Sequence, residues 1–250
     1  MINKLLPTDM TAEAFAKAIS VTPKEILSSN SKLRADGIQN ITMPAFKGYY
    51  LHGGKLTVQN TCPGAKACKA YCYAGVAGTY GFVNSMVKHS RNLNYVMNKP
   101  YDFADQLVDE ISVKAKNPKF RAVRWHDSGD VFSEGYWGVM KVVMAALPHV
   151  KFYAYTKMVS FFKGRDDIPA NFTIVFSQGG TDDALIDTEN DRHAHVFSSR
   201  GALRKAGYSD GTNTDRLASN SKFRKIGLVV HGNHKAMPKF RRMVERNDKG

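Results

Sequence analysis

Cysteine is scarce in this 250-residue sequence, which has only three, and long apolar runs are missing. A membrane-spanning helix needs about 18 or more consecutive apolar residues, so we expect no membrane span and no membrane partner. The first nine residues lack the charged head and apolar stretch of a secretory signal. Three cysteines cannot all pair within one chain, which argues against a secreted scaffold held by disulfides. We therefore expect a cytoplasmic protein.

Acidic residues are also few, because 22 Asp and Glu stand against 36 Lys and Arg, giving a net charge of +14. The last thirty residues, 221–250, hold nine Lys or Arg and two acids, a net charge of +7. A basic region of this kind favours polyanions, so nucleic acid or an acidic host protein is one expected partner of it. A solvated cationic segment that keeps the protein soluble is the other interpretation.

The N-terminal part of the chain has the pattern of short helices. Residues 9–30 predict two of them, the second from a Thr-Pro-x-Glu capping box at 22–25. We interpret residues 1–47 as an N-terminal helical cap and lead-in. The remaining residues, 48–250, form one predicted domain that carries the cysteines.

Beyond this cap, six segments with the composition of strands alternate with segments of helical periodicity. This alternation predicts parallel βαβ units, so we expect an α/β fold, a partial (β/α) barrel of about six mostly parallel strands. The glycine pair at 53–54 also predicts a hairpin between the first segment and residues 48–52. Apolar spacing predicts long helices within 82–97 and 103–115 and another around 136–147. The strand segments are 55–59, 120–126, 150–156, 172–177, 195–198 and 226–230.

Polar residues and glycines directly follow five of these strands. Ligand sites of parallel α/β folds lie at the carboxyl ends of the strands, so we expect these residues to line one site. A small anionic or nucleotide-like molecule is the predicted ligand. The candidate ligand-binding residues are Asp127, Ser128, Gly129, Asp130, Lys157, Ser177, Gln178, Gly179, Gly180, Ser199, Arg200 and His231.

Individual members of this set have alternative interpretations. Lys157 and Arg200 suit a carboxylate, sulfate or phosphate, because one is a point charge and the other a planar fork of donors. The two aspartates, Asp127 and Asp130, would orient a ribose or amine group or act as a base, and equally would serve as helix N-caps. The glycine pair at 179–180 would bring backbone amides close to an anion, or form a plain turn.

All three cysteines lie within residues 61–75, directly behind the strand predicted at 55–59, with the spacing Cys-x5-Cys-x3-Cys. Clustered thiols in a reducing compartment bind metal or do redox work more often than they form disulfides. Zinc usually has four protein ligands, so His231 or His234 would have to complete a zinc site. Three thiolates on one loop instead suit an iron–sulfur cluster with one iron left open. The predicted metal ligands are Cys62, Cys68 and Cys72, which would otherwise be small buried apolar residues.

The motifs of the chain resemble those of a known family. Thr-Cys-Pro-Gly-Ala at 61–65 and Tyr-Cys-Tyr-Ala at 71–74 are followed by Trp-His-Asp-Ser-Gly-Asp at 125–130. Together they resemble the gene product 88 type family of phage and mobile-element proteins, over roughly residues 40–200. The resemblance implies a phage or plasmid origin, with the host cytoplasm as the location.

A looser resemblance is to the radical S-adenosylmethionine enzymes. These carry three cysteines on the loop after the first strand of a six-stranded partial barrel, with an aromatic residue before the third, where Tyr71 stands here. The resemblance implies a [4Fe–4S] cluster on Cys62, Cys68 and Cys72 whose open iron faces S-adenosylmethionine or another ligand. The spacing is longer than their Cys-x3-Cys-x2-Cys, and residues 128–130 read Ser-Gly-Asp where those enzymes have Gly-Gly-Glu.

Two functions follow from these patterns. The first is an iron–sulfur protein whose open iron faces a polar pocket at the strand ends, with a small anionic or nucleotide-like ligand. The second is a non-enzymatic module that binds nucleic acid or a host protein through residues 221–250, with an iron–sulfur or zinc site that is structural. The sequence assigns no catalytic residue to either.

Overall fold

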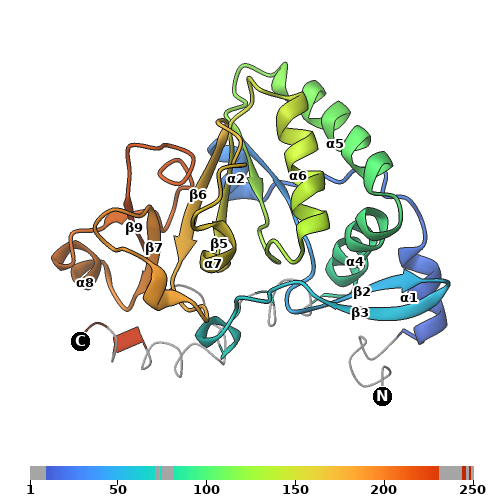
Figure 1. Cartoon of the computed structure of the whole chain (residues 1–250), viewed down its shortest axis with the longest axis horizontal. Coiled ribbons are helices and arrows are strands. Elements are labelled where there is room, and N and C mark those ends of the chain that lie inside the picture. The colour runs from blue at the N-terminus through green and yellow to red at the C-terminus, as the bar shows by residue number, and fades with distance from the viewer. Residues whose placement is uncertain are drawn as a thin grey trace.

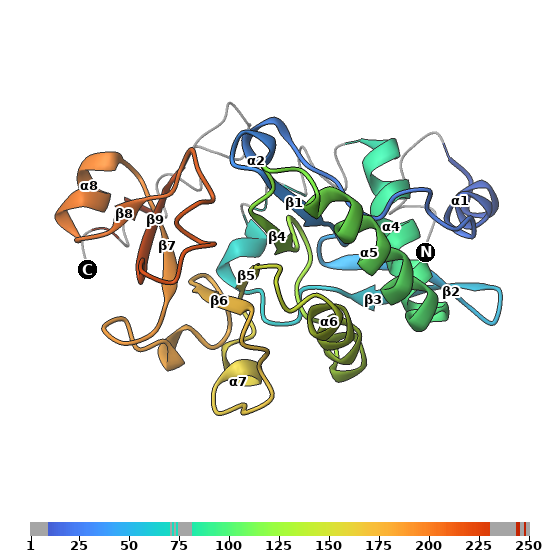
Figure 2. The same ribbon diagram turned by 90° about the horizontal axis from the view of Figure 1, so that it is seen from above.

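The structure is a computed structural model that describes residues 10–70, 72, 74, 82–230, 244, 245 and 248. Its main element is a seven-stranded sheet in the order β1-β4-β5-β6-β7-β9-β8, in which every neighbouring pair is parallel. The sheet curls into a half barrel with helices against it (Figures 1 and 2), which confirms the predicted α/β class and partial barrel. The strands are β1 (Ile38–Ile41), β4 (Ala122–Trp125), β5 (Phe152–Thr156), β6 (Phe172–Ser177), β7 (His193–Phe197), β8 (Ser209–Asp210) and β9 (Lys225–Val229).

A separate antiparallel hairpin and several helices surround this sheet (Figure 1). The predicted hairpin is confirmed as β2 (Lys47–His52) and β3 (Lys55–Asn60), with Gly53 and Gly54 both at positive φ in the turn. The first predicted helix is α1, which Thr11 caps by accepting a hydrogen bond from the amide of Ala14. The helices are α1 (Ala12–Ile19), α2 (Ser31–Ala35), α4 (Val83–Asn98), α5 (Pro100–Ala115), α6 (Glu134–Ala146), α7 (Val159–Phe162) and α8 (Arg200–Lys205), with 3-10 turns η2 (Ala67–Ala70) and η3 (Asp183–Leu185).

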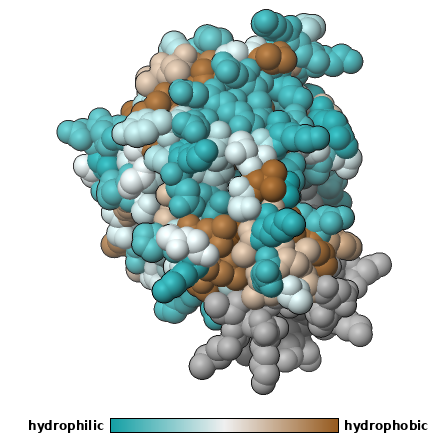
Figure 3. All heavy atoms as spheres, turned by 90° about the vertical axis from the view of Figure 1, so that its right-hand side faces the viewer, coloured by the Kyte–Doolittle hydropathy of each residue, from teal (hydrophilic) through white to brown (hydrophobic). Residues whose placement is uncertain are grey.

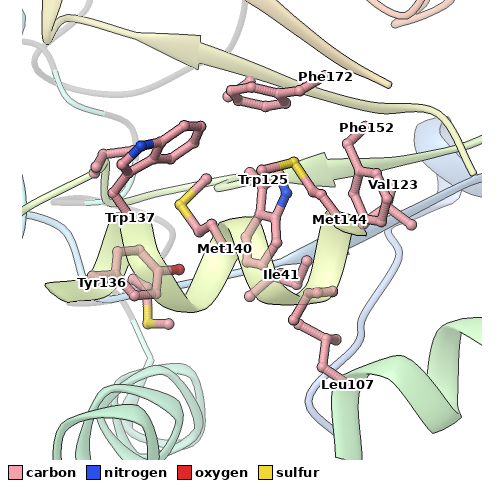
Figure 4. Packing of buried hydrophobic residues seen from close by; sticks show 14 of the residues in the cluster. Ile41, Leu107, Val123, Trp125, Tyr136, Trp137, Met140, Met144, Phe152 and Phe172 are labelled. Carbon is pink, nitrogen blue, oxygen red and sulfur yellow. The ribbon is translucent and has the colours of Figure 1, made fainter. Parts of the chain in front are cut away.

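The larger part of the core lies between the sheet and helices α5 and α6 (Figure 4). Trp125 on β4 stacks on Phe152 of β5 with 6.2 Å between the ring centroids, and both side chains are buried. Trp137 of α6 meets Phe162 edge-on from the helix side. Because strand residues alternate between faces, the neighbours of these aromatics point to the opposite, concave face of the half barrel.

The concave face has a smaller apolar cluster of its own. Ala122, Tyr153, Val175, Ala194 and Ile226 point into it from five strands. The segment 211–224 packs across one end of this face, where Ala218 joins the cluster and Leu217 and Phe223 lie against it. The other end of the face, toward the carboxyl ends of the strands, carries the polar residues described below.

Two expectations about the N-terminal part of the chain are wrong. Residues 55–59 are not the first strand of the barrel, since β3 pairs only with β2, and the first strand is β1 within the predicted lead-in. Residues 22–27 are not helical, because the carboxylate of Glu110 accepts hydrogen bonds from the amides of Ile26 (2.9 Å) and Leu27 (2.9 Å). These amides are thereby satisfied outside a helix.

The surface over α5, α1 and the hairpin is mainly hydrophilic, with apolar residues in patches (Figure 3). No described helix is long and apolar enough to cross a membrane. The helix predicted around Met237, Phe240 and Met243, and most of the basic residues between 231 and 250, lie outside the described residues.

Candidate functional site

Residues 61–75, which carry the three cysteines and are called the cysteine loop here, belong to the connection that leads from β1 to α4. This connection first forms the β2–β3 hairpin, and Cys62 follows β3 two residues after the strand ends. The η2 turn, which contains Cys68, then lies at the end of the sheet toward which the β6 arrow points (Figure 1). The loop is thus placed at the carboxyl ends of the parallel strands.

Thr61 fixes the start of this loop between the loops that follow β1 and β4. Its side chain is fully buried, and its Oγ1 donates a 2.6 Å hydrogen bond to the carbonyl of Pro44. Its amide donates to the carbonyl of Phe46 (2.8 Å), and its own carbonyl accepts from the amide of Asp130 (2.8 Å). The amide of Phe46, which has a left-handed φ of 58°, donates in turn to the Cys62 Sγ at 3.4 Å.

The middle of the loop is bonded through its backbone to the loop after β6. The amides of Lys66 and Cys68 donate to the carbonyl of Gly179 at 3.2 and 3.1 Å, and the amide of Thr181 donates to the carbonyl of Gly64 at 2.9 Å. A Cβ on Gly64 would lie 2.5 Å from the carbonyl oxygen of Lys157. This approach requires glycine at position 64. The turn at 179–180 receives the loop through the carbonyl of Gly179, while the amides of Gly179 and Gly180 both donate to the carboxylate of Asp183 at 2.8 Å.

Asp130 ties the loops after β4 and β5 together. Its carboxylate is 6% exposed and accepts hydrogen bonds from Thr156 Oγ1 (2.7 Å) and from the amides of Val131 (2.8 Å) and Lys157 (2.8 Å). Burial raises the pKa of Asp130, and these hydrogen bonds oppose that rise. Both carboxylate oxygens accept hydrogen bonds within the protein, so Asp130 holds these loops together.

Lys157 presents a cation to this part of the molecule. Its Nζ donates a 2.8 Å hydrogen bond to Ser177 Oγ, and no carboxylate of the described residues lies within ion-pair distance of it. Burial raises the pKa of Cys68, and the charge of Lys157 is the largest effect that lowers it. Lys157 and Cys68 are therefore close enough for their charges to interact.

The three cysteines are half-buried and lie within electrostatic reach of one another. Burial raises the pKa of Cys62 to about 12, and the charges of Cys68 and Cys72 raise it further. Among the described residues, no three His, Cys, Asp or Glu side chains are close enough to hold a single metal ion. Zinc with bonds of about 2.3 Å requires sulfurs about 4 Å apart, whereas a cuboidal cluster binds each cysteine to a different iron and accepts wider spacing.

A family model described as Gene product 88 matches residues 24–247. The chain belongs to this family. The Gene product 88 match covers the cysteine loop and all seven strands of the main sheet. No curated protein and no solved structure matches the chain, and the resemblance to radical S-adenosylmethionine enzymes gains no support from these comparisons.

Other predicted site residues of this Gene product 88 protein serve the loops around the cysteines. Ser128 donates to the carbonyl of Met43 at 2.7 Å, and Gly129 has a positive φ of 84° with Met43 against it. Asp127 lies 3.4 Å from the guanidinium of Arg124. The amide of Gln178 donates to the carbonyl of Ala194, the next strand of the sheet.

The remaining three predicted residues are not brought to the cysteine loop by any contact that the structure describes. Ser199 is the N-cap of α8 and accepts a hydrogen bond from the amide of Ala202. Arg200 forms an ion pair with Asp210 of β8 at 2.8 Å, and its side chain is 51% exposed. His231 lies outside the described residues.

Sequence reasoning missed His126 and the polar residues of the concave face. His126 is 2% exposed with a positive φ of 66°, and its Nε2 lies 2.9 Å from the hydroxyl of Tyr136. Burial lowers the pKa of His126 to about 3, so the imidazole is neutral at physiological pH. On the concave face, Tyr155 and Arg192 lie among apolar neighbours. Tyr155 is two residues after Tyr153, and Arg192 is two residues before Ala194. Strand alternation therefore places both on the same face as Tyr153 and Ala194, once that face is known to be the concave one.

Proposed function

We propose that this member of the Gene product 88 family is an iron–sulfur protein of phage or mobile-element origin. Cys62, Cys68 and Cys72 hold a [4Fe–4S] cluster whose fourth iron is open toward the strand ends. A small anionic or nucleotide-like ligand binds there, with Lys157 as its positive partner. The proposal rests on one observation above all, the docking of the cysteine loop on Gly179 beside the ammonium of Lys157.

The position of the loop in the chain supports the cluster. In radical S-adenosylmethionine enzymes the three cysteines follow the first barrel strand, and here they lie in the connection after β1, beyond the β2–β3 hairpin. Three cysteine ligands leave one iron with an exchangeable position, and such an iron binds a ligand and, when the cluster is reduced, supplies it with an electron. S-adenosylmethionine is one candidate ligand of this position.

The surrounding residues support an anionic ligand. Lys157 is half-buried with only a neutral hydroxyl, that of Ser177, as hydrogen-bond partner of its ammonium. Asp130 and Thr156 hold the backbone of Lys157 in place, so the charge is positioned before a ligand arrives. A preorganised cation loses little conformational entropy on binding an anion.

Anaerobic purification tests the cluster. We expect a brown protein with iron and sulfide in near-equal amounts, and Cys68→Ala should lose the iron. Lys69→Ala is the matched control, because Lys69 is exposed on the same loop and should leave the iron content unchanged. A colourless protein with stoichiometric zinc, or full iron content in Cys68→Ala, would show that the assignment is wrong.

Electron paramagnetic resonance of the reduced protein tests the open iron. A ligand that binds this iron should alter the signal, so spectra with and without S-adenosylmethionine are compared. A changed spectrum assigns S-adenosylmethionine to the site. An unchanged spectrum with a loaded cluster directs the search to other anionic ligands.

The charge distribution favours a second function, binding of nucleic acid or a host protein by residues 221–250, in which the metal site is structural. Neutralising Arg241, Arg242 and Arg246 together should weaken nucleic-acid binding and reduce its dependence on salt, because each phosphate contact releases counterions. An unchanged salt dependence would remove the reason for this function.

A further inference from the structure

The concave face contains a guanidinium group with unused donors. Arg192 precedes β7, and its Nη2 donates to the carbonyls of Leu217 and Ala218 (2.8 Å) in the segment that crosses this face. Its Nε and Nη1 are buried and have no hydrogen-bond partner in the part of the chain that the structure describes. Buried polar groups are almost always paired, and an unpaired one costs roughly 1–3 kcal/mol, so these two groups indicate a missing acceptor.

The neighbouring carboxylates are already used by other cations. Asp215 accepts from Arg124 (2.9 Å) and Lys32 (2.8 Å), and Asp36 pairs with Arg216 (3.0 Å). No carboxylate of the described residues lies within ion-pair distance of Arg192. No direct ion pair with a described residue therefore balances the charge of Arg192. Burial disfavours the charged guanidinium and lowers its pKa.

Tyr155 offers a further donor beside this guanidinium. Tyr155 lies on the same face as Arg192. It pairs with Val175 of β6, and the next residue of that strand, Phe176, donates from its amide to the carbonyl of Arg192. No described residue accepts a hydrogen bond from its hydroxyl, and the electrostatic interaction between Tyr155 and Arg192 acts on the ionisation of both groups. Arg124 covers the ring of Tyr155 from the other side, with its guanidinium carbon 5.2 Å from the ring centroid.

The concave face is partly exposed near the carboxyl ends of the strands. Val196, Leu228 and Ser177 point toward it from β7, β9 and β6 and remain partly exposed, whereas Ala194 and Ile226, one step lower, are buried. Arg192 lies one step further toward the amino end than Ala194, at the level of Val175 and Tyr155, so a ligand from this edge must pass Ala194 and Ile226 to reach its buried donors.

We propose that Arg192 and Tyr155 form an oxyanion site on the concave face, which binds one carboxylate or phosphate group of a small molecule. The guanidinium donates from Nε and Nη1, and the phenol donates a third hydrogen bond. Arginine suits such groups because its planar donors match their oxygens. The site contains no cysteine and no metal ligand, so it is independent of the cluster proposed above.

Binding of inorganic phosphate and of acetate to the full-length protein tests this site, with titration calorimetry and thermal unfolding at constant ionic strength balanced by chloride. Arg192→Gln is compared with Arg204→Gln, which removes the same charge from an exposed position on α8. A saturable response to one probe in the wild type should persist in Arg204→Gln and weaken at least tenfold in Arg192→Gln. Non-specific screening of the +14 charge would affect both variants equally.

The two probes identify the ligand group, because a response to phosphate alone assigns a phosphate ligand and one to acetate alone assigns a carboxylate. Should Arg192→Gln fail to fold, Tyr155→Phe replaces it and should weaken binding several-fold, since only the hydroxyl is lost. Equal affinity in Arg192→Gln and the wild type, or no saturable response of the wild type to either probe, would overturn the proposal. Absence of iron from the protein would leave it standing.

Discussion

Replacement of Gly64 by alanine should release the cysteine loop from the sheet. The added Cβ would lie 2.5 Å from the carbonyl oxygen and 2.9 Å from the carbonyl carbon of Lys157, while ordinary contact begins at 3.4 Å. The added Cβ is fixed to the backbone of residue 64, and the two atoms it would meet belong to the backbone of Lys157, so no flexible side chain can move aside. The loop must therefore shift by roughly 1 Å, enough to break hydrogen bonds that are already about 3 Å long.

Three backbone hydrogen bonds depend on this approach, from the amides of Lys66 and Cys68 to Gly179 and from Thr181 to Gly64. Each contributes about 1 kcal/mol net, so their loss costs about 3 kcal/mol of docking free energy. That corresponds to roughly a 100-fold increase in loop opening. Amide hydrogen exchange of peptides that cover residues 64–69 and 179–181 should accelerate by this factor, and iron content should fall if the cluster is present.

Gly138→Ala is the matched control. Gly138 lies in α6, and a Cβ there meets no atom within 4 Å. The same chemical change should stabilise the protein by up to about 1 kcal/mol, because alanine is the better helix former. If Gly64→Ala keeps wild-type hydrogen exchange at both peptides, the reasoning about this contact is refuted.

Three further predictions concern the carboxylates of Asp215 and Glu110 and can be checked by urea unfolding. Asp215→Asn should lower the free energy of unfolding by about 3 kcal/mol, because it leaves two cations beside a neutral amide. Asp210→Asn, which changes an exposed ion pair, should lower it by less than about 1 kcal/mol. Equal losses in the two variants would contradict this prediction. Burial raises the pKa of Asp215, but its basic partners lower it by more, so the pKa in the folded protein lies below the ordinary value of 3.8. The stabilisation by Asp215 is therefore complete above pH 3.8 and is lost as the pH falls below that value. Asp215→Asn should not show this loss. Glu110→Ala should cost about 2–3 kcal/mol through the two buried amides it leaves unpaired, and Asp109→Ala, its exposed neighbour, should change stability by no more than about 0.5 kcal/mol.

The central strands of the sheet could be predicted because they are buried on both faces. Eight of the eleven residues of β5 and β6 are apolar or aromatic, as expected of parallel strands covered by helices. β1 could not, because its four residues include Gln39 and Asn40, and Asn40 is buried only through its hydrogen bond to Thr42 Oγ1. A strand of this composition resembles a loop when read alone.

The candidate site was predictable to the extent that it follows from chain direction. Parallel strands end at one edge, so Asp130, Lys157 and Gly179 were expected to meet, and their contacts bring them together. Arg200 was misplaced because its partner, Asp210, belongs to a strand too short to recognise. Arg192 was missed because the carbonyls that orient it are 25 and 26 residues away, and no local pattern encodes such a contact.

The docking of the cysteine loop also has a consequence for the order of folding. Gly64 and Thr181 are 117 residues apart, and their contact requires β4, β5 and β6 to be paired first. Contacts between distant parts of a chain form late, because closing a long loop costs entropy before any interaction repays it. During synthesis, the segment with the three cysteines leaves the ribosome long before the surface that receives it. The thiols therefore remain accessible on the growing chain until β6 is complete.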